Sequence, residues 1–435
     1  MKAIDFLPSQ LVAFDEPTDP QIESAAELEE VARHLDIESW ILQRLLHPER
    51  ELTTNLIVDG KNGNPLMFTG YRVQHLTSRG PTLGGVSFSP HAYLTGVRAS
   101  AMQATWQAAL LNLPFGGAAG AVICNPDELS EDELRQLSKN YAHALRGIVG
   151  RFDDVLSPGL GCHTQMIAWM LDSIAQDSGR MEPGAAAGKP ESLYGLPDYT
   201  GMTTRGILAL VEALAQRNVT GSAALSRNDG LRGLRFSVQG FGALGASLAR
   251  ELYDRGAKVV AIADISGGLY NSEGIDVPSL QKYVDERAIT IGFGGADAVR
   301  NADVLEADCD LLIAAATERQ ISNTNAARIR AQVVIEAAKW AVTSFAEQNL
   351  ALRGITVIPE ILATAGAAVA AFLEWNQSAR FSAFSAAEMQ VELTSRVTTG
   401  LNSVLTAAAK NNSTLRRAAH LIAIDRIASE MRVRR

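Results

Sequence analysis

The sequence predicts an α/β fold of two domains, on the basis of length, alternation and one local motif. The chain has 435 residues, more than a single hydrophobic core usually supports. Its apolar runs alternate between strand-like and helix-like periods without internal repeats. A strand, a glycine-rich turn, a helix and a second strand follow one another over residues 235–264, as in a dinucleotide-binding unit. We expect an N-terminal α/β domain over 1–200, completed by 366–435, and a Rossmann-like domain over 201–365.

Composition and charge are those of an ordinary soluble globular protein. Apolar residues make up 47% and charged residues 20% of the sequence. The net charge of −9 leaves no basic surplus to neutralise phosphates, so nucleic acid is not an expected partner. No apolar run reaches the roughly 18 residues of a membrane span. The N-terminal stretch carries acids and proline where a signal peptide has an apolar core. We expect a cytoplasmic protein that does not enter a membrane.

The cysteines and histidines form no motif typical of a catalytic or metal site. The cysteines are widely spaced and odd in number, which favours reduced thiols and no metal: Cys124, Cys162 and Cys309. The histidines that invite a catalytic role have no partner in motif spacing and are interpreted as structural: His75, His163 and His420. Cys162 and His163 are adjacent at the start of a helix, where their side chains point apart, so they are not expected to act as a nucleophile pair.

In the first half, helical and strand-like patterns are clear. Apolar residues recur at helical spacing over 24–50, which predicts one amphipathic helix. Residues 52–58 and 66–75 read as strands on either side of the turn DGKNGN, a hairpin pattern. The pair Ser130 and Glu133 predicts a capping box at a helix start. Further helices are expected over 94–112, 129–149 and 163–178.

The second half begins after a stretch rich in glycine and proline, residues 181–201, which marks the expected passage between domains. The motif there is LRFSVQGFGALGASLARELYDRGAKVVAIAD. Its glycines would let the backbone approach a pyrophosphate at the N-terminus of the following helix. Asp264 would accept hydrogen bonds from ribose hydroxyls and repel a 2′-phosphate, which favours NAD over NADP. The alternative is that the glycines serve close packing alone. Residues 310–322 and 332–340 read as buried parallel strands.

Three glycine- and proline-rich stretches of the first half carry a family resemblance. They read GYRVQHLTSRGPTLGGVSFSP over 70–90, TWQAALLNLPFGGAAGA over 105–121 and LSPGLGCHTQMIAW over 156–169. They resemble the active-site segments of the glutamate, leucine, phenylalanine and valine dehydrogenases. The stretch VIPEILATAGAAVAAFLEWNQ over 357–377 and the tail from Arg416 resemble the closing segments of the same family. The resemblance implies a substrate domain closed by C-terminal helices, and a hexamer.

The charged residues of that framework are missing. The family's catalytic and substrate-binding lysines and aspartate correspond here to Leu83, Gln107, Ala119 and Gly159. There is no lysine between Lys61 and Lys139 that could substitute. Oxidising an amino acid requires a cation for the substrate carboxylate and groups that move protons. These side chains supply neither, so we expect no intact catalytic residue.

The resemblance also implies cofactor and effector positions. The expected NAD-binding residues are Gly240, Gly242, Ala243, Leu244, Gly245, Asp264, Ile265, Thr203, Ala315 and Ala316. The expected substrate or effector pocket contains Leu83, Gln107, Ala119, Thr364, Ala371 and Lys339. Lys339 stands where the family has an asparagine in a GANGPT turn, and Trp340 and Val342 replace small or turn-forming residues. Bulk and charge therefore lie where a nicotinamide ring would bind.

The function favoured by these observations is that of an inactive or strongly impaired regulatory subunit. It would assemble into a hexamer with a catalytically intact relative and could bind an amino-acid effector. One alternative is an active NAD-dependent amino-acid or imine oxidoreductase with a remodelled site. Another is a sensor of NAD or of an amino acid. The missing lysines and aspartate distinguish the regulator from the enzyme.

Overall fold

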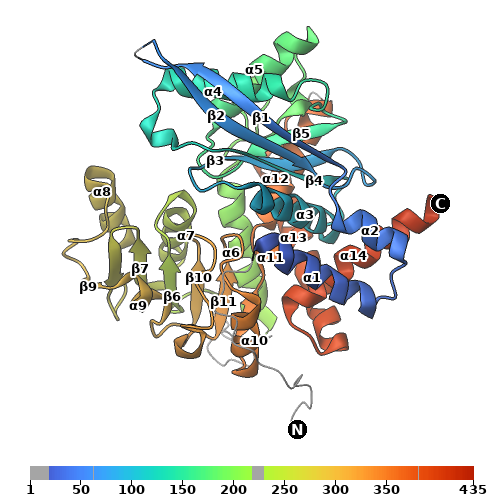
Figure 1. Cartoon of the computed structure of the whole chain (residues 1–435). Coiled ribbons are helices and arrows are strands. Elements are labelled where there is room, and N and C mark those ends of the chain that lie inside the picture. The colour runs from blue at the N-terminus through green and yellow to red at the C-terminus, as the bar shows by residue number, and fades with distance from the viewer. Residues whose placement is uncertain (1–18, 62, 218–229, 381) are drawn as a thin grey trace.

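The computed structural model describes residues 19–435 except 62, 218–229 and 381. It contains two β-sheets, each covered by helices, and a group of C-terminal helices between them and beside the first sheet (Figure 1). This confirms the predicted α/β class. Among the described residues, no helix is long and apolar enough to cross a membrane.

The first sheet contains the family-like stretches. Its strand order is β1-β2-β4-β3-β5, with β1 and β2 antiparallel and β4, β3 and β5 parallel. The strands are β1 (Arg50–Asp59), β2 (Pro65–Gln74), β3 (Thr82–Phe88), β4 (Gly116–Val122) and β5 (Asp154–Pro158). The helices α4 (Glu131–Ala144) and α5 (Thr164–Ser178) cover one face, and α3 (Leu94–Leu110) covers the other (Figure 1). The predicted hairpin and the capping box of Ser130 and Glu133 are confirmed.

The second sheet is the Rossmann-like unit. Its order is β12-β11-β10-β6-β7-β8-β9, parallel from β12 to β7 and antiparallel beyond. The strands are β6 (Arg235–Gln239), β7 (Lys258–Asp264), β8 (Gly267–Tyr270), β9 (Asp297–Val299), β10 (Leu311–Ala314), β11 (Val333–Glu336) and β12 (Thr356–Ile358). Its helices are α6 (Gly201–Arg217), α7 (Ala243–Asp254), α8 (Val277–Arg287), α9 (Asn301–Leu305) and α10 (Ser344–Leu352).

The C-terminal helices return to the first half of the chain. They are α11 (Glu360–Ala363), α12 (Ala365–Arg380), α13 (Ala386–Asn411) and α14 (Leu415–Val433). Three guanidinium groups satisfy backbone carbonyls at the end of α3: Arg79 bonds Leu113, Arg396 bonds Leu111 and Arg426 bonds Ala109. Carbonyls at a helix end have no partner within the helix. Arginines of α13 and α14 therefore fix the segment that precedes the LPFGG motif.

A close helix crossing joins the second sheet's helices to the C-terminal group. A Cβ added at Gly366 of α12 would lie 2.2 Å from the carbonyl oxygen of Met202 in α6. A Cβ at Gly206 would lie 3.0 Å from Cα of Gly366. Only glycine permits helix backbones to approach this closely. The crossing sets the position of α6 against α12, between the two sheets.

Some predicted elements were wrong in extent. The single helix expected over 24–50 is two helices, α1 (Pro20–His34) and α2 (Ser39–Leu46). The chain breaks between them because Asp36 adopts the left-handed region, with φ of 50°, which a helix cannot include. The strands expected over 310–322 and 332–340 are only the four-residue β10 and β11. Helix α13 was not predicted.

Candidate functional site

The three family-like stretches meet on neighbouring strands. Leu83 of β3 lies opposite Gly117 of β4 on one side and Val155 of β5 on the other. A Cβ added at Gly84 would lie 1.6 Å from the carbonyl oxygen of Ala118. One at Gly117 would lie 2.2 Å from the backbone nitrogen of Thr105 in α3. The glycines of these motifs are thus required by strand and helix packing, whatever chemistry the site performs.

Three of the residues expected in the substrate or effector pocket are apolar and buried. Leu83 is 8% exposed, Ala119 is 5% exposed and Ala371 is 2% exposed. Leu83 and Ala371 belong to the main hydrophobic core. Ala119 packs with Val73 and Val97 in a small separate cluster. Side chains of this kind can neither bind a carboxylate nor transfer a proton.

The turn after β5 has no space for an aspartate. A Cβ added at Gly159 would lie 2.6 Å from Oγ of Ser87 and 2.8 Å from the carbonyl oxygen of Val86. The N–H of Gly159 donates to that same Val86 oxygen at 2.9 Å. A side chain at this position would therefore force the turn away from β3. Restoring the carboxylate requires a backbone change as well as a substitution.

Gln107 has acquired a structural contact. Its Nε2 donates to Oγ1 of Thr364 at 2.8 Å and to the carbonyl oxygen of Ile361 at 3.2 Å. These bonds connect α3 to α11 and the start of α12. Two of the predicted pocket residues, Gln107 and Thr364, are thus brought together and satisfy each other.

The glycine turn, residues Gly240–Gly245, lies between β6 and α7. Gly240 has φ of 101°, and a Cβ there would lie 2.8 Å from the backbone of Ala315 and Ala316. A Cβ at Gly245 would lie 1.8 Å from the carbonyl oxygen of Gly240. Packing therefore explains both glycines.

Gly242 differs, because a Cβ added there would meet no atom within 4 Å. Its φ of −77° is open to any residue, and it is the N-cap of α7 with no side-chain cap. The space above Gly242, with the N-terminus of α7 at its base through Ala243 and Leu244, fits a diphosphate. The residues present at this turn therefore fit the expected NAD.

Asp264 ends β7 as predicted, but its carboxylate already accepts hydrogen bonds from other residues of the chain. It accepts hydrogen bonds from the N–H of Ser266 at 2.7 Å, of Gly267 at 3.3 Å and of Thr290 at 2.9 Å. Partial burial raises the pKa of Asp264, but the hydrogen bonds from Ser266 and Thr290 outweigh it and hold the pKa below its usual value. The carboxylate is ionised and oriented, so a ribose would share these oxygens with the loop. The next residue, Ile265, is fully exposed.

Trp340, Lys339 and Thr203 are the residues expected at the nicotinamide side. Trp340 has φ of 50°, a conformation rare for a bulky residue, and its carbonyl oxygen accepts a hydrogen bond from the N–H of Arg319 at 2.8 Å. Lys339 is exposed to solvent. Thr203, in the first turn of α6, lies against Gly366 of α12.

Two buried ion pairs near α12 and α14 were not predicted from the sequence. Lys189 and Glu374, both buried, are 2.7 Å apart and join the segment before α6 to α12. Glu336 accepts hydrogen bonds from the N–H of Val342 and Glu360 and pairs with Arg416 of α14 at 2.9 Å. A lone charge within an apolar stretch was the available signal, as for Glu374 in AAFLEW. Such a charge needs a partner in the core.

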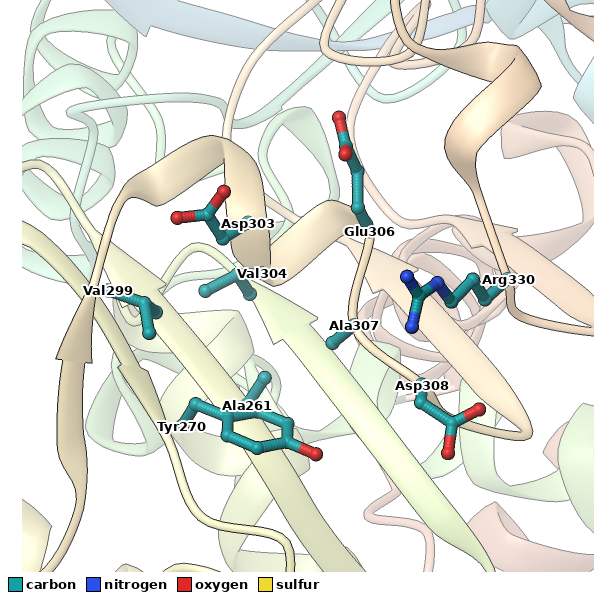
Figure 2. Close-up of a pocket in the computed structure, with 9 residues that line it drawn as sticks. All are labelled: Ala261, Tyr270, Val299, Asp303, Val304, Glu306, Ala307, Asp308 and Arg330. Atoms are coloured by element: carbon teal, nitrogen blue, oxygen red, sulfur yellow. The ribbon is translucent and has the colours of Figure 1, made fainter.

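A cavity of about 270 Å³ lies elsewhere in the Rossmann-like unit, between β7, β8 and α9 (Figure 2). Its carboxylates are paired with arginines outside the lining: Asp303 with Arg300, Glu306 with Arg328 and Asp308 with Arg235. None of the predicted site residues lines it. Among the described residues, no group of histidine, cysteine and acidic side chains could hold a metal ion.

Comparison with known proteins agrees with this arrangement. The family model described as Glutamate/Leucine/Phenylalanine/Valine dehydrogenase matches residues 195–435, and the corresponding dimerisation-domain model matches residues 48–176. Glutamate dehydrogenase A2 of Halobacterium salinarum is 34% identical over 93% of this chain and 95% of its own length. The catabolic NAD-specific glutamate dehydrogenase of Bacillus subtilis is 34% identical over 94% of each chain.

Among solved structures, the hetero-hexameric glutamate dehydrogenase of Thermus thermophilus in a Leu-bound form matches with a TM-score of 0.86 and 32% identity. The match covers 98% of this chain and 99% of that chain. The glutamate dehydrogenase of Peptoniphilus asaccharolyticus matches with a TM-score of 0.79 and 27% identity, covering 95% of this chain and 99% of that one. The predicted resemblance and fold are confirmed.

Proposed function

Since the chain belongs to the glutamate, leucine, phenylalanine and valine dehydrogenase family, we propose that it is an inactive or strongly impaired member acting as a regulatory subunit. Its partner would be a catalytically intact glutamate dehydrogenase-like chain in a hetero-oligomer. The observation that carries the proposal is the turn at Gly159, where a Cβ would lie 2.8 Å from the backbone carbonyl oxygen of Val86. The backbone itself has lost the space for the expected carboxylate.

The loss of activity follows from the chemistry. Removing one preorganised catalytic donor typically costs on the order of 100- to 1000-fold in rate. Leu83, Ala119 and Gly159 are apolar or lack a side chain, and Gln107 is bonded to Thr364. No side chain at these positions is left to bind a carboxylate or to accept the substrate's proton.

Binding of NAD is a separate part of the proposal. NAD supplies a hydride acceptor when it is bound to a catalytic relative. Here the open space at Gly242 and the N-terminus of α7 would hold its diphosphate, and Asp264 and Ile265 would face its adenosine. Thr203, Ala315 and Ala316 would lie nearer the nicotinamide, where Trp340 and Lys339 oppose productive placement. The role proposed for NAD is therefore binding without turnover.

The first sheet supplies elements for assembly. Strand β1 is an edge strand of ten residues, and such edges readily pair with another chain. Ile57 and Met67 lie opposite each other near the hairpin tip and are 61% and 72% exposed. These features lie within the segment that matches the dimerisation-domain model. We propose a hexamer in which this sheet contributes contacts, with domain boundaries near residues 200 and 365.

An apolar amino acid is the proposed effector class. Leu83, Ala119 and Ala371 are uncharged, and the similar Thermus thermophilus structure is a Leu-bound form. If the chain binds such a ligand or NAD without a partner, it is a self-contained sensor. If it oxidises an amino acid or an imine, it is an active oxidoreductase with a remodelled site.

The test has two parts. The purified chain should show no NAD- or NADP-coupled oxidation of glutamate, leucine, valine or phenylalanine above the baseline without enzyme. Co-expressed with a relative that has the lysines and aspartate, it should co-purify as a hetero-oligomer with an altered rate or effector response, a coupling typically worth about 1–3 kcal/mol. Robust turnover by the isolated chain would support the oxidoreductase. Clean separation on size exclusion, with unchanged kinetics of the relative, would refute the regulatory subunit.

A further inference from the structure

One loop connects the glycine turn to helices of the first half of the chain. This loop, residues 315–320, follows β10, and its first residues, Ala315 and Ala316, pack against Gly240. The N–H of Ala315 donates to the carbonyl oxygen of Gln239 at 2.8 Å. The side-chain amide of Gln239 also donates to Gln320 at the end of the loop. Both ends of the loop are therefore fixed to the residue that precedes the glycine turn.

Arg319, near the end of the same loop, contacts α1. Nη1 of Arg319 donates to Oε1 of Glu23 at 3.0 Å, across 296 residues of sequence. The side chains of Arg319 and Glu23 are 33% and 24% exposed, so the pair is partly shielded from water. Partial burial makes such a pair stronger than a fully exposed one.

Glu318, the residue before Arg319, interacts electrostatically with Tyr93 at the start of α3. Tyr93 is the N-cap of α3, and its ring lies over Gly96, where an added Cβ would be 2.9 Å from the ring. Partial burial, together with the negative charges of Glu318 and Asp19, raises the pKa of Tyr93 to about 12.

The loop backbone is held in an unfavourable conformation. Arg319 has φ of 57° and Trp340 has φ of 50°, and the two are joined by a hydrogen bond. Non-glycine residues in this region cost of order 1 kcal/mol and persist where surrounding contacts impose them. With its backbone in this conformation, Arg319 pairs with Glu23 through its side chain.

We infer that Glu23 and Arg319 form an interdomain clasp that couples occupancy of the glycine turn by a dinucleotide to the position of α1. A diphosphate bound at Gly242 restrains the turn and, through Ala315 and Gln320, the loop that presents Arg319. The regulatory meaning of this coupling rests on the proposed function, because α1 belongs to the half of the chain proposed to assemble. The coupling itself is a property of the isolated chain.

The clasp is tested by hydrogen exchange of the full chain with and without NADH. In the unmodified chain, NADH should slow exchange both in α7 and in α1, residues 20–34. In Arg319→Gln, protection of α7 should persist, protection of α1 should be lost, and NADH should bind about two- to fivefold more weakly. Arg328→Gln is the matched control, since Arg328 pairs with Glu306 within the Rossmann-like unit; it should behave as the unmodified chain.

A charge reversal provides a second variant. Glu23→Arg combined with Arg319→Glu should restore the response of α1 that either single change removes. The clasp is wrong if α1 responds equally in Arg319→Gln, if it does not respond in the unmodified chain with NADH bound, or if NADH does not bind. None of these results affects co-purification with a catalytic relative, so failure of the clasp and failure of the regulatory-subunit proposal are distinguishable.

Discussion

The first sheet and the glycine turn both contain glycine-rich motifs, but for different physical reasons. At Gly84, a Cβ would lie 1.6 Å from a backbone oxygen of the neighbouring strand. At Gly242, a Cβ would meet nothing within 4 Å. Packing requires the glycine of the first motif whatever side chains surround it, whereas no packing constraint in the described structure explains Gly242. Motif glycines alone therefore say little about activity until the space around each one is known.

The largest expected effect concerns a buried ion pair that joins two strands of the first sheet. Arg72 of β2 donates to both carboxylate oxygens of Asp154 at the start of β5, and both side chains are fully buried. Asp154→Ala leaves a buried guanidinium without its counter-ion, so the free energy of unfolding should fall by about 3–5 kcal/mol. Urea unfolding measures this fall in the free energy of unfolding. If the variant does not fold, a loss of soluble yield shows the destabilisation.

The control for that change is Glu51→Gln, which breaks the partly exposed pair of Glu51 and Arg98 at 2.9 Å. Its effect on unfolding should stay below about 1 kcal/mol. Equal losses in the free energy of unfolding for the two variants would contradict the view that the buried pair stabilises the sheet more than the exposed pair does.

The second prediction compares two glycines directly. Gly84→Ala should lower the free energy of unfolding by about 3 kcal/mol, because backbone atoms must move to admit the methyl group. Gly242→Ala should lower it by no more than about 1 kcal/mol, the loss of a good N-cap residue. It should weaken NADH binding on the order of tenfold, because the methyl occupies the space of the diphosphate. Calorimetry and urea unfolding of both variants decide; unaltered NADH affinity in Gly242→Ala would place the nucleotide elsewhere.

The smallest effect is a pH dependence at Glu336, which joins β11 to α14. Burial raises the pKa of Glu336 from its ordinary value of 4.5 to about 6, although Arg416 opposes this. A raised folded-state pKa means that the folded chain binds the proton more tightly than the unfolded chain. The contribution to stability is therefore fully present below the ordinary value and is lost as pH rises through about 6.

Urea unfolding should show this as a difference in slope. Relative to Glu336→Gln, the unmodified chain should gain about 1–2 kcal/mol as pH falls from about 7 to about 5. The difference in slope isolates Glu336 from carboxylates that titrate in both proteins. Parallel pH profiles would mean that Glu336 is ionised throughout this range.

The sequence alone determined the α/β class, the hairpin, the capping box of Ser130 and Glu133 and the glycine turn before α7. Each of these depends on a period or spacing within a few residues, which a single segment records. The residue types at Leu83, Gln107, Ala119 and Gly159 can likewise be read directly from the sequence.

Tertiary structure decided every feature that depends on contacts between residues far apart in the sequence. The lack of space at Gly159 is set by Val86 on another strand, and the engagement of Asp264 is set by Thr290. The pairing of Arg319 with Glu23 spans 296 residues. These contacts are fixed by the packing of whole elements against one another, and no local period or propensity of the sequence encodes the distance between them.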